Sequence, residues 1–241
     1  MQTLRLAPLA LTTIFMTLAL AACGESTTPQ AQPAAPEAEA TPAEPRTDTA
    51  AVDAFNAYRL NASSGMGAEA LEHVHPSYFD LVQRHIDLAL DADRATIEAL
   101  PFFDRFMVFA VRVRVEPGVL RTITPHAFAK MAIDHGWIES ELIAAVMVES
   151  VELLPEGLAE PEQAEITMSL GGRTNPTTMP LLYEDGRWLV DLATLTERGA
   201  ASAEQMAELM GDDADDIVVR GLAAKEGKPV PEDIYAPIGR E

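Results

Sequence analysis

The chain has 241 residues, and its 38 acidic side chains outnumber its 17 lysines and arginines, which gives a formal net charge of −21 at pH 7. Such an acidic surface repels phosphate backbones, so we expect no nucleic-acid partner. The single cysteine excludes an intramolecular disulfide and a thiolate metal cluster, and an apolar core must therefore stabilise the fold.

A short apolar segment lies at the N-terminus. Residues 6–22 are apolar except for one proline and three threonines, and Arg5 places a positive charge before them. A run of about 17 residues is short for a transmembrane helix and has the length of a secretory signal. It ends in Leu20-Ala21-Ala22-Cys23, which resembles the lipobox of bacterial lipoproteins.

The lipobox resemblance implies cleavage between Ala22 and Cys23 and acylation of the Cys23 thiol. We therefore expect a signal peptide over residues 1–22 and attachment to a lipid membrane through acylated Cys23, which is stable when more than one chain is present. Gly24 and Glu25 follow without the Asp that retains many lipoproteins at the inner membrane. In an organism with two membranes, this favours the periplasmic face of the outer membrane. The alternatives are an ordinary cleavable signal and an uncleaved anchor.

Residues 23–50 have the composition of a disordered tether. After Cys23 they contain many alanines and no aromatic or large aliphatic residue, with prolines at positions 29, 33, 36, 42 and 45. Such a segment cannot bury enough apolar surface to offset the entropy of ordering. We expect it to hold the folded part away from the membrane.

The folded part is expected to begin with helices. Apolar residues recur at helical spacing in several segments, and Ser77 is expected to cap the third helix. Thr124-Pro125 predicts the start of the last helix of this group and Gly136 its end, with Trp137 packing back against it. The predicted helices cover residues 51–60, 69–73, 77–90, 102–115 and 125–135.

After residue 145 the pattern favours strands. We predict strands over residues 146–154 and 165–170 and a hairpin over residues 181–192. Asp185-Gly186 is typical of a two-residue turn with positive φ at both positions. That turn sets the register of three pairs: Glu184 opposite Arg187, Tyr183 opposite Trp188, and Leu181 opposite Val190. The hairpin should therefore present one apolar face to the helices.

Helices followed by an antiparallel sheet give an α+β fold, with N-terminal helices packed on a curved sheet. The order of elements, together with the hairpin ending Glu184-Asp185-Gly186-Arg187-Trp188 and Asp191, resembles the cone fold of the nuclear transport factor 2-like (ketosteroid isomerase-like) superfamily. We assign this domain to residues 51–198. Residues 199–241 are expected to form an acidic helical tail, whose first helix opens at a capping box, Ser202 to Gln205, and runs to Met210.

Candidate pocket residues are few, and no motif selects among them. An Asp with a Tyr or His serves proton transfer in some enzymes of the resembled superfamily, and Asp80 is a further acid that could take part. For Asp104 the competing interpretation is a salt bridge with Arg105 or Arg112, and for the aromatic residues it is a place in the core. The candidates are Tyr78, His85, Asp104, Tyr183 and Trp188.

We expect no metal and no cofactor. A zinc site would have to combine His73, His75 and His85 with Asp80, but His75 precedes a proline at a predicted helix break, and no second ligand cluster with recognisable spacing is present.

Three functions remain open. The first is a membrane-anchored, non-catalytic module of the envelope that binds a small apolar ligand or a protein partner. The second is a structural or envelope-assembly lipoprotein with no pocket. The third is a cone-fold enzyme that performs proton transfer or hydrolysis, so whether the chain is an enzyme stays undecided, with a non-catalytic role favoured.

Overall fold

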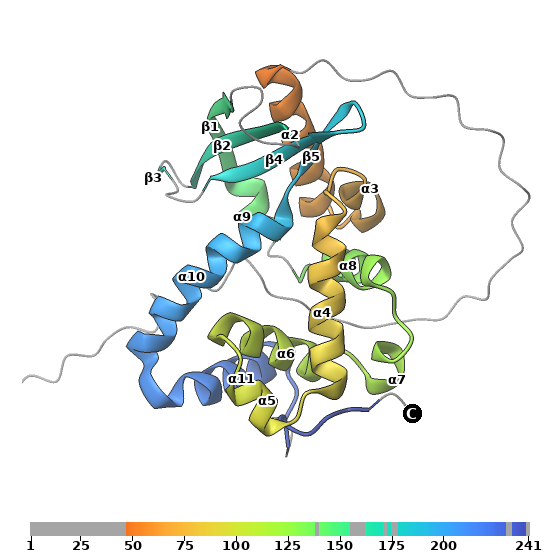
Figure 1. Cartoon of the computed structure of the whole chain (residues 1–241), viewed down its shortest axis with the longest axis vertical. Helices are drawn as coiled ribbons and strands as arrows, with labels where there is room; N and C mark the ends of the chain where they lie inside the picture. The colour runs from red at the N-terminus through yellow and green to blue at the C-terminus, as the bar shows by residue number, and fades with distance from the viewer. Residues whose placement is uncertain are drawn as a thin grey trace, which may run out of the picture.

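A computed structural model describes residues 47–137, 140–154, 162–170, 173–174, 178–229 and 233–239. The fold is α+β, as expected: an antiparallel sheet lies at one end and a group of helices lies at the other (Figure 1). Helices α4 and α10 run between the two ends, and the short α8 lies beside α4. The helices are α2 (Asp48–Ser63), α3 (Gly67–Leu71), α4 (Ser77–Asp91), α5 (Arg94–Glu98), α6 (Phe102–Arg114), α7 (Pro117–Leu120), α8 (Pro125–Asp134), α9 (Ser140–Ala145), α10 (Leu192–Met210) and α11 (Ala214–Lys225). The strands are β1 (Val146–Leu153), β2 (Glu162–Leu170), β3 (Arg173–Thr174), β4 (Met179–Glu184) and β5 (Arg187–Val190).

The hairpin β4–β5 confirms the predicted turn and register. Asp185 has φ 51° and Gly186 has φ 79°, the positive values that a type I′ turn requires. The structure pairs Glu184 with Arg187, Tyr183 with Trp188, and Leu181 with Val190, as predicted.

The sheet is open and has the order β1-β2-β4-β5, with the short β3 beside one end of β2. The segment before α4 lies along β5, because the Val190 N–H donates to the His73 carbonyl at 2.7 Å and the His75 N–H donates to the Val190 carbonyl at 2.9 Å. One face of the sheet packs on α2 and α3 and forms the first core, which we call the sheet core. Its residues include Phe55, Tyr58, Leu71, Ile166, Leu181, Trp188 and Val190.

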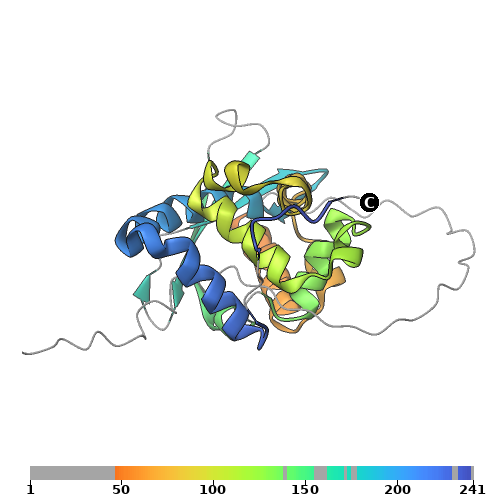
Figure 2. The ribbon, with the colours of Figure 1, turned by 90° about the horizontal axis from the view of Figure 1, so that it is seen from below.

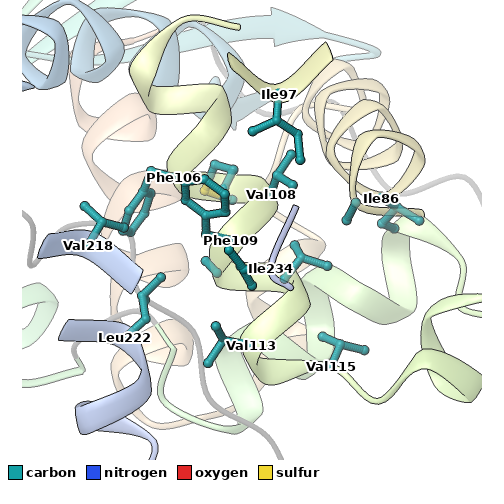
Figure 3. Close-up of a cluster of buried hydrophobic side chains, with 14 of the residues drawn as sticks. Ile86, Ile97, Phe106, Val108, Phe109, Val113, Val115, Val218, Leu222 and Ile234 are labelled. Atoms are coloured by element: carbon teal, nitrogen blue, oxygen red, sulfur yellow. The ribbon is translucent and has the colours of Figure 1, made fainter. Parts of the chain in front are cut away.

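A second core, the helical core, is built from α4, α5, α6, α7, α8 and α11 (Figure 3). Helix α6 is buried almost all round, as its continuous apolar sequence predicts. Helix α8 joins the two cores, because Phe128 and Ala132 belong to the helical core while Ala129 and Ile133 belong to the sheet core.

Helix α8 begins and ends at the predicted residues. The Thr124 side chain accepts from the Ala127 N–H, and Pro125 is the first helical residue. At the other end the Trp137 N–H donates to the Ala132 carbonyl at 2.8 Å and the Gly136 N–H donates to the Ile133 carbonyl at 2.9 Å. These two bonds form a Schellman motif, and they bring Trp137, which is buried, back onto the helix.

Helix α4 starts at the predicted residue, but the predicted cap at Ser77 is wrong, and so is the predicted helix start at Ser202. Ser77 is the first residue of α4 and its side chain caps nothing; the ring nitrogen Nδ1 of His75 instead accepts from the Ser77 N–H at 3.3 Å. The capping-box pattern at Ser202 starts no helix, because α10 begins ten residues earlier, where the Asp191 carboxylate accepts from the Thr194 N–H. Helix α10 therefore continues through residues 198 and 199 without a break.

The helices and strands of the described residues include α9, which the sequence pattern did not predict. None of the helices in the described ranges is long and apolar enough to cross a membrane. The expected signal peptide, Ala22, Cys23 and most of the expected tether lie outside the described residues.

Candidate functional site

The polar cluster at the edge of the helical core joins α4 to α6. Asp104, in the first turn of α6, is the centre of the cluster. One carboxylate oxygen of Asp104 lies 2.9 Å from Nε2 of His85, and the other accepts from Nη2 of Arg84. The side chains of His85 and Asp104 are 3% and 9% exposed, whereas that of Arg84 is 54% exposed. His85 and Asp104 are therefore buried, and the Arg84 side chain lies between them and solvent.

The pKa of Asp104 lies below its ordinary value of 3.8. Burial alone would raise this pKa, but the hydrogen bond from His85 and the positive charge of Arg84 act against burial and outweigh it. Asp104 is therefore an ionised carboxylate at neutral pH, and both of its oxygens already accept hydrogen bonds. A carboxylate held in this way positions its neighbours and is poorly suited to abstract a proton.

The partner of Asp104 differs from the one that the sequence suggested. Arg105 pairs with Asp215 of α11, with Nε–O distances of 3.0 and 3.1 Å. Arg112 donates to the carbonyls of Leu88, Ala89 and Ala92 at the end of α4. The expected salt bridge of Asp104 with Arg105 or Arg112 is therefore wrong, and Arg84 takes that place.

The aromatic candidates lie in the other core. Trp188 is 1% exposed in the sheet core, and Tyr183 on the neighbouring strand packs beside it, with ring centroids 5.2 Å apart. Tyr78 contacts both cores. The structure therefore brings His85 and Asp104 together but gathers the five candidates into no common pocket.

A second tyrosine, Tyr58 on the apolar face of α2, is buried in the sheet core, against which Tyr78 also packs. Burial raises the pKa of Tyr78 to about 12. Burial and the neighbouring Tyr78 also raise the pKa of Tyr58. Both phenols are therefore neutral over the physiological range and serve as parts of the packed interior.

The histidines of the zinc alternative have separate partners. His75 lies between Ser77, whose Oγ is 2.8 Å from Nδ1, and Glu184, whose Oε2 is 3.1 Å from Nε2. His85 contacts Asp104, and Asp80 is exposed. Within the described ranges, no group of three or more His, Cys, Asp or Glu residues is arranged to hold a metal ion.

An open hollow of about 400 Å³ lies beside the cluster, where the end of α4 meets α5. The residues around it are Arg84, Asp87, Leu88, Asp91, Ala92 and Thr96. Asp104 and His85 do not line it, so the buried pair has no access to a ligand bound there. No family model, no curated protein and no solved structure matches this chain.

Proposed function

We propose that the chain is a lipoprotein of the bacterial envelope, attached to the membrane through acylated Cys23, whose folded part binds a protein partner and performs no catalysis. The lipobox at residues 20–23 carries the membrane attachment. The closed Arg84–Asp104–His85 cluster is the observation that supports a non-catalytic role. Its acid and its histidine already contact each other, and only Arg84 reaches solvent.

The proposal favours a protein partner over a small apolar ligand. A cone-fold ligand would bind between the sheet and its covering helices. In this chain the sheet core is lined there by Ala164, Ile166, Leu181 and Val190, each of which is fully buried against the protein's own side chains. Binding that uses the outer surface is compatible with this packing, and it needs no reorganisation of the core.

We further propose that the folded part is a divergent cone-fold domain of the nuclear transport factor 2-like type. The support is the packing of α2 and α3 on one face of an open antiparallel sheet, and the hairpin β4–β5 with its Asp-Gly turn. Helices α5, α6, α7 and α8, together with α4 and α11, add the helical core to this arrangement. The predicted tether ends earlier than residue 50, because α2 begins at Asp48 with Thr47 as its N-cap. The residues between Cys23 and Thr47 would then act as the tether, and the anchor would place the folded part in the cell envelope.

Membrane fractionation of cells tests the attachment. The full chain should pellet with membranes and incorporate labelled palmitate. Cys23→Ala should be unlabelled and should leave the washed membrane fraction, because acyl chains bound to the thiol are the anchor. Gln30→Ala, in the tether, is the matched control and should behave as the unchanged protein. Labelling that persists in Cys23→Ala would show that the lipobox interpretation is wrong.

A further inference from the structure

The ring of His75 links the start of helix α4 to the hairpin β4–β5. Its nitrogen Nδ1 accepts from the Ser77 N–H at 3.3 Å and lies 2.8 Å from the Ser77 Oγ. Its other nitrogen, Nε2, lies 3.1 Å from Oε2 of Glu184, the last residue of β4. The His75 side chain is 15% exposed, so the ring is in contact with solvent although both nitrogens have protein partners.

The main chain on either side of the ring is held by β5. The His75 N–H and the His73 carbonyl both bond to Val190, and Val74 between them is buried and forms a parallel bridge with the same residue. These bonds do not involve the imidazole. A change in the charge of the ring therefore acts on the hydrogen bonds of its two nitrogens, on a backbone that stays in place.

The contact with Glu184 identifies the nitrogen that carries the hydrogen. A carboxylate accepts hydrogen bonds and donates none, so Nε2 of His75 must be the donor. In the neutral ring, which has one hydrogen on nitrogen, Nδ1 is then the acceptor. This agrees with the bond that Nδ1 receives from the Ser77 N–H. Protonation of His75 therefore takes place at Nδ1, at the start of α4.

Nδ1 caps α4 in the neutral state. The first N–H groups of a helix have no partner within the helix and need an acceptor from outside it. The Tyr78 N–H donates to the His75 carbonyl at 3.1 Å, and the Phe79 N–H donates to the Pro76 carbonyl at 2.9 Å. The Ser77 N–H uses the imidazole instead. The ring thus does what an N-cap side chain does in other helices.

Protonation exchanges this cap for a stronger contact with the hairpin. Once Nδ1 carries a hydrogen it cannot accept from the Ser77 N–H, and it donates to the Ser77 Oγ instead. The imidazolium also forms an ion pair with Glu184, and such a charge-assisted bond is stronger than one from a neutral ring. The dipole of α4 acts in the opposite direction, because a positive charge is unfavourable at a helix N-terminus.

Several other charged groups lie on the elements that meet at His75. Arg187 of β5 stands opposite Glu184 in the hairpin, and its Nη1 donates to the Glu72 carbonyl at 3.2 Å. Asp80 lies in the first turn of α4. Glu184 is the one that contacts the ring, and His73 is a second histidine in the same segment. The charged and titratable residues to be considered are Glu72, His73, Asp80, Glu184, Arg187 and Asp191.

The position of α4 gives this exchange its consequence. Helix α4 starts beside the sheet and runs to the helical core, in which Val82, Ile86 and Leu90 are buried (Figure 1). From below, α4 is seen end-on beside α6, against which it packs (Figure 2). The first turn of α4 is therefore the point at which the helix leaves the sheet, and its hydrogen bonds help to fix how the two cores are joined.

We propose that His75 is a pH-sensitive joint between the hairpin and α4. In its neutral form it caps α4 through Nδ1. In its protonated form it releases the Ser77 N–H and binds Glu184 as an ion pair, so that acid loosens the first turn of α4 and tightens the contact with the hairpin. The inference goes beyond the proposed function and does not depend on it.

A nuclear magnetic resonance titration of the full-length, ¹⁵N-labelled chain in detergent tests the proposal. It covers the range from about pH 8 to pH 5, in which histidine side chains change their charge. At the upper end, the ¹⁵N shifts of the His75 ring should show a hydrogen on Nε2 and none on Nδ1. As the pH falls, the Ser77 amide signal should move with the same midpoint as the His75 ring.

Three variants separate His75 from its neighbours. His75→Gln removes the titrating ring and should abolish the pH dependence of the Ser77 amide signal in this range. His73→Gln is the matched control and should leave that dependence unchanged. Glu184→Gln should lower the midpoint of the His75 titration by at least about 0.3 pH units, because the imidazolium loses the carboxylate that favours it.

Four outcomes would overturn the proposal. They are a neutral ring with its hydrogen on Nδ1, a Ser77 amide signal that stays still while the His75 ring titrates, a midpoint that Glu184→Gln leaves unchanged, and a Ser77 titration that persists in His75→Gln. If His75→Gln does not fold, the ring shifts and the Ser77 titration of the unchanged chain decide. The anchor plays no part in this assay, so failure here leaves the fractionation result standing.

Discussion

Asp104 of α6 lies 2.9 Å from Nε2 of His85 on α4, and both side chains are almost entirely buried. The pair ties two helices of the helical core at a point that only Arg84 separates from solvent. Its geometry is that of a structural contact, so its removal should lower the free energy of unfolding.

Asp104→Asn should lower the free energy of unfolding by about 2 kcal/mol, because the neutral amide cannot accept two charge-assisted hydrogen bonds as the carboxylate does. Urea denaturation followed by circular dichroism measures the change. Asp80→Asn, at an exposed position of the same helix as His85, is the control and should change stability by less than about 0.5 kcal/mol. Equal effects of the two substitutions would refute the assigned role of Asp104.

Acid should destabilise the protein. The pKa values of Asp104 and Glu165 lie below their ordinary values of 3.8 and 4.5, so the unfolded chain binds more protons than the folded one in this range. The stability that these carboxylates contribute is therefore fully present when the pH is above their ordinary pKa values. It is lost as the pH falls through their lowered pKa values in the folded protein. The thermal midpoint, measured between pH 7 and pH 3, should fall at the acid end.

In the variant Asp104→Asn combined with Glu165→Gln, the acid dependence of the midpoint should be flatter than in the unchanged protein. A midpoint that falls equally in both proteins would assign the acid sensitivity to other carboxylates.

The bidentate pair of Arg198 and Glu165 joins α10 to the sheet. Nη2 and Nη1 of Arg198 donate to the two Glu165 oxygens at 2.7 and 2.9 Å, and Thr178 donates to the same carboxylate. The Arg198 side chain is 38% exposed, so solvent screens the pair. A double-mutant cycle with Arg198→Ala and Glu165→Ala should give a coupling of about 0.5–1 kcal/mol, and no coupling would show that the pair contributes nothing.

Gly67 fixes the approach of α3 to α8. A Cβ at this position would lie 2.5 Å from Oδ1 of Asp134 and 2.6 Å from the Lys130 carbonyl oxygen. Because one of these atoms is backbone, Gly67→Ala should cost about 2 kcal/mol of stability. Gly118→Ala, in α7, meets no atom within 4 Å and should change stability by less than about 0.5 kcal/mol. A tolerated Gly67→Ala would contradict the close packing of these helices.

The features that the sequence predicted correctly are local ones. The register of β4–β5 follows from two turn residues, Asp185 and Gly186, and the end of α8 follows from Gly136. The true start of α10 at Leu192 was missed because the capping pattern at Ser202 is also a local signal. In the structure the helix that begins after Asp191 continues through Ser202, so the pattern there starts no new helix.

The partner of Asp104 was missed for a geometric reason. Arg105 is the next residue on the helix and points about 100° away, and Arg112 lies about two turns further along, so neither faces the carboxylate. Arg84 reaches it from another helix, and no spacing in the sequence indicates that approach. The division into two cores likewise depends on contacts between segments that are far apart in the sequence. The hydrophobic pattern of a single helix does not show which of these distant segments it will contact.

The most direct test of the membrane-anchored account is the mass of the protein purified from the membranes of its own cells, with sequencing of its N-terminal peptide. The account predicts a chain that begins at Cys23, lacks residues 1–22 and carries acyl chains on that cysteine. A chain that retains residues 1–22, or that begins elsewhere with an unmodified Cys23, would contradict it.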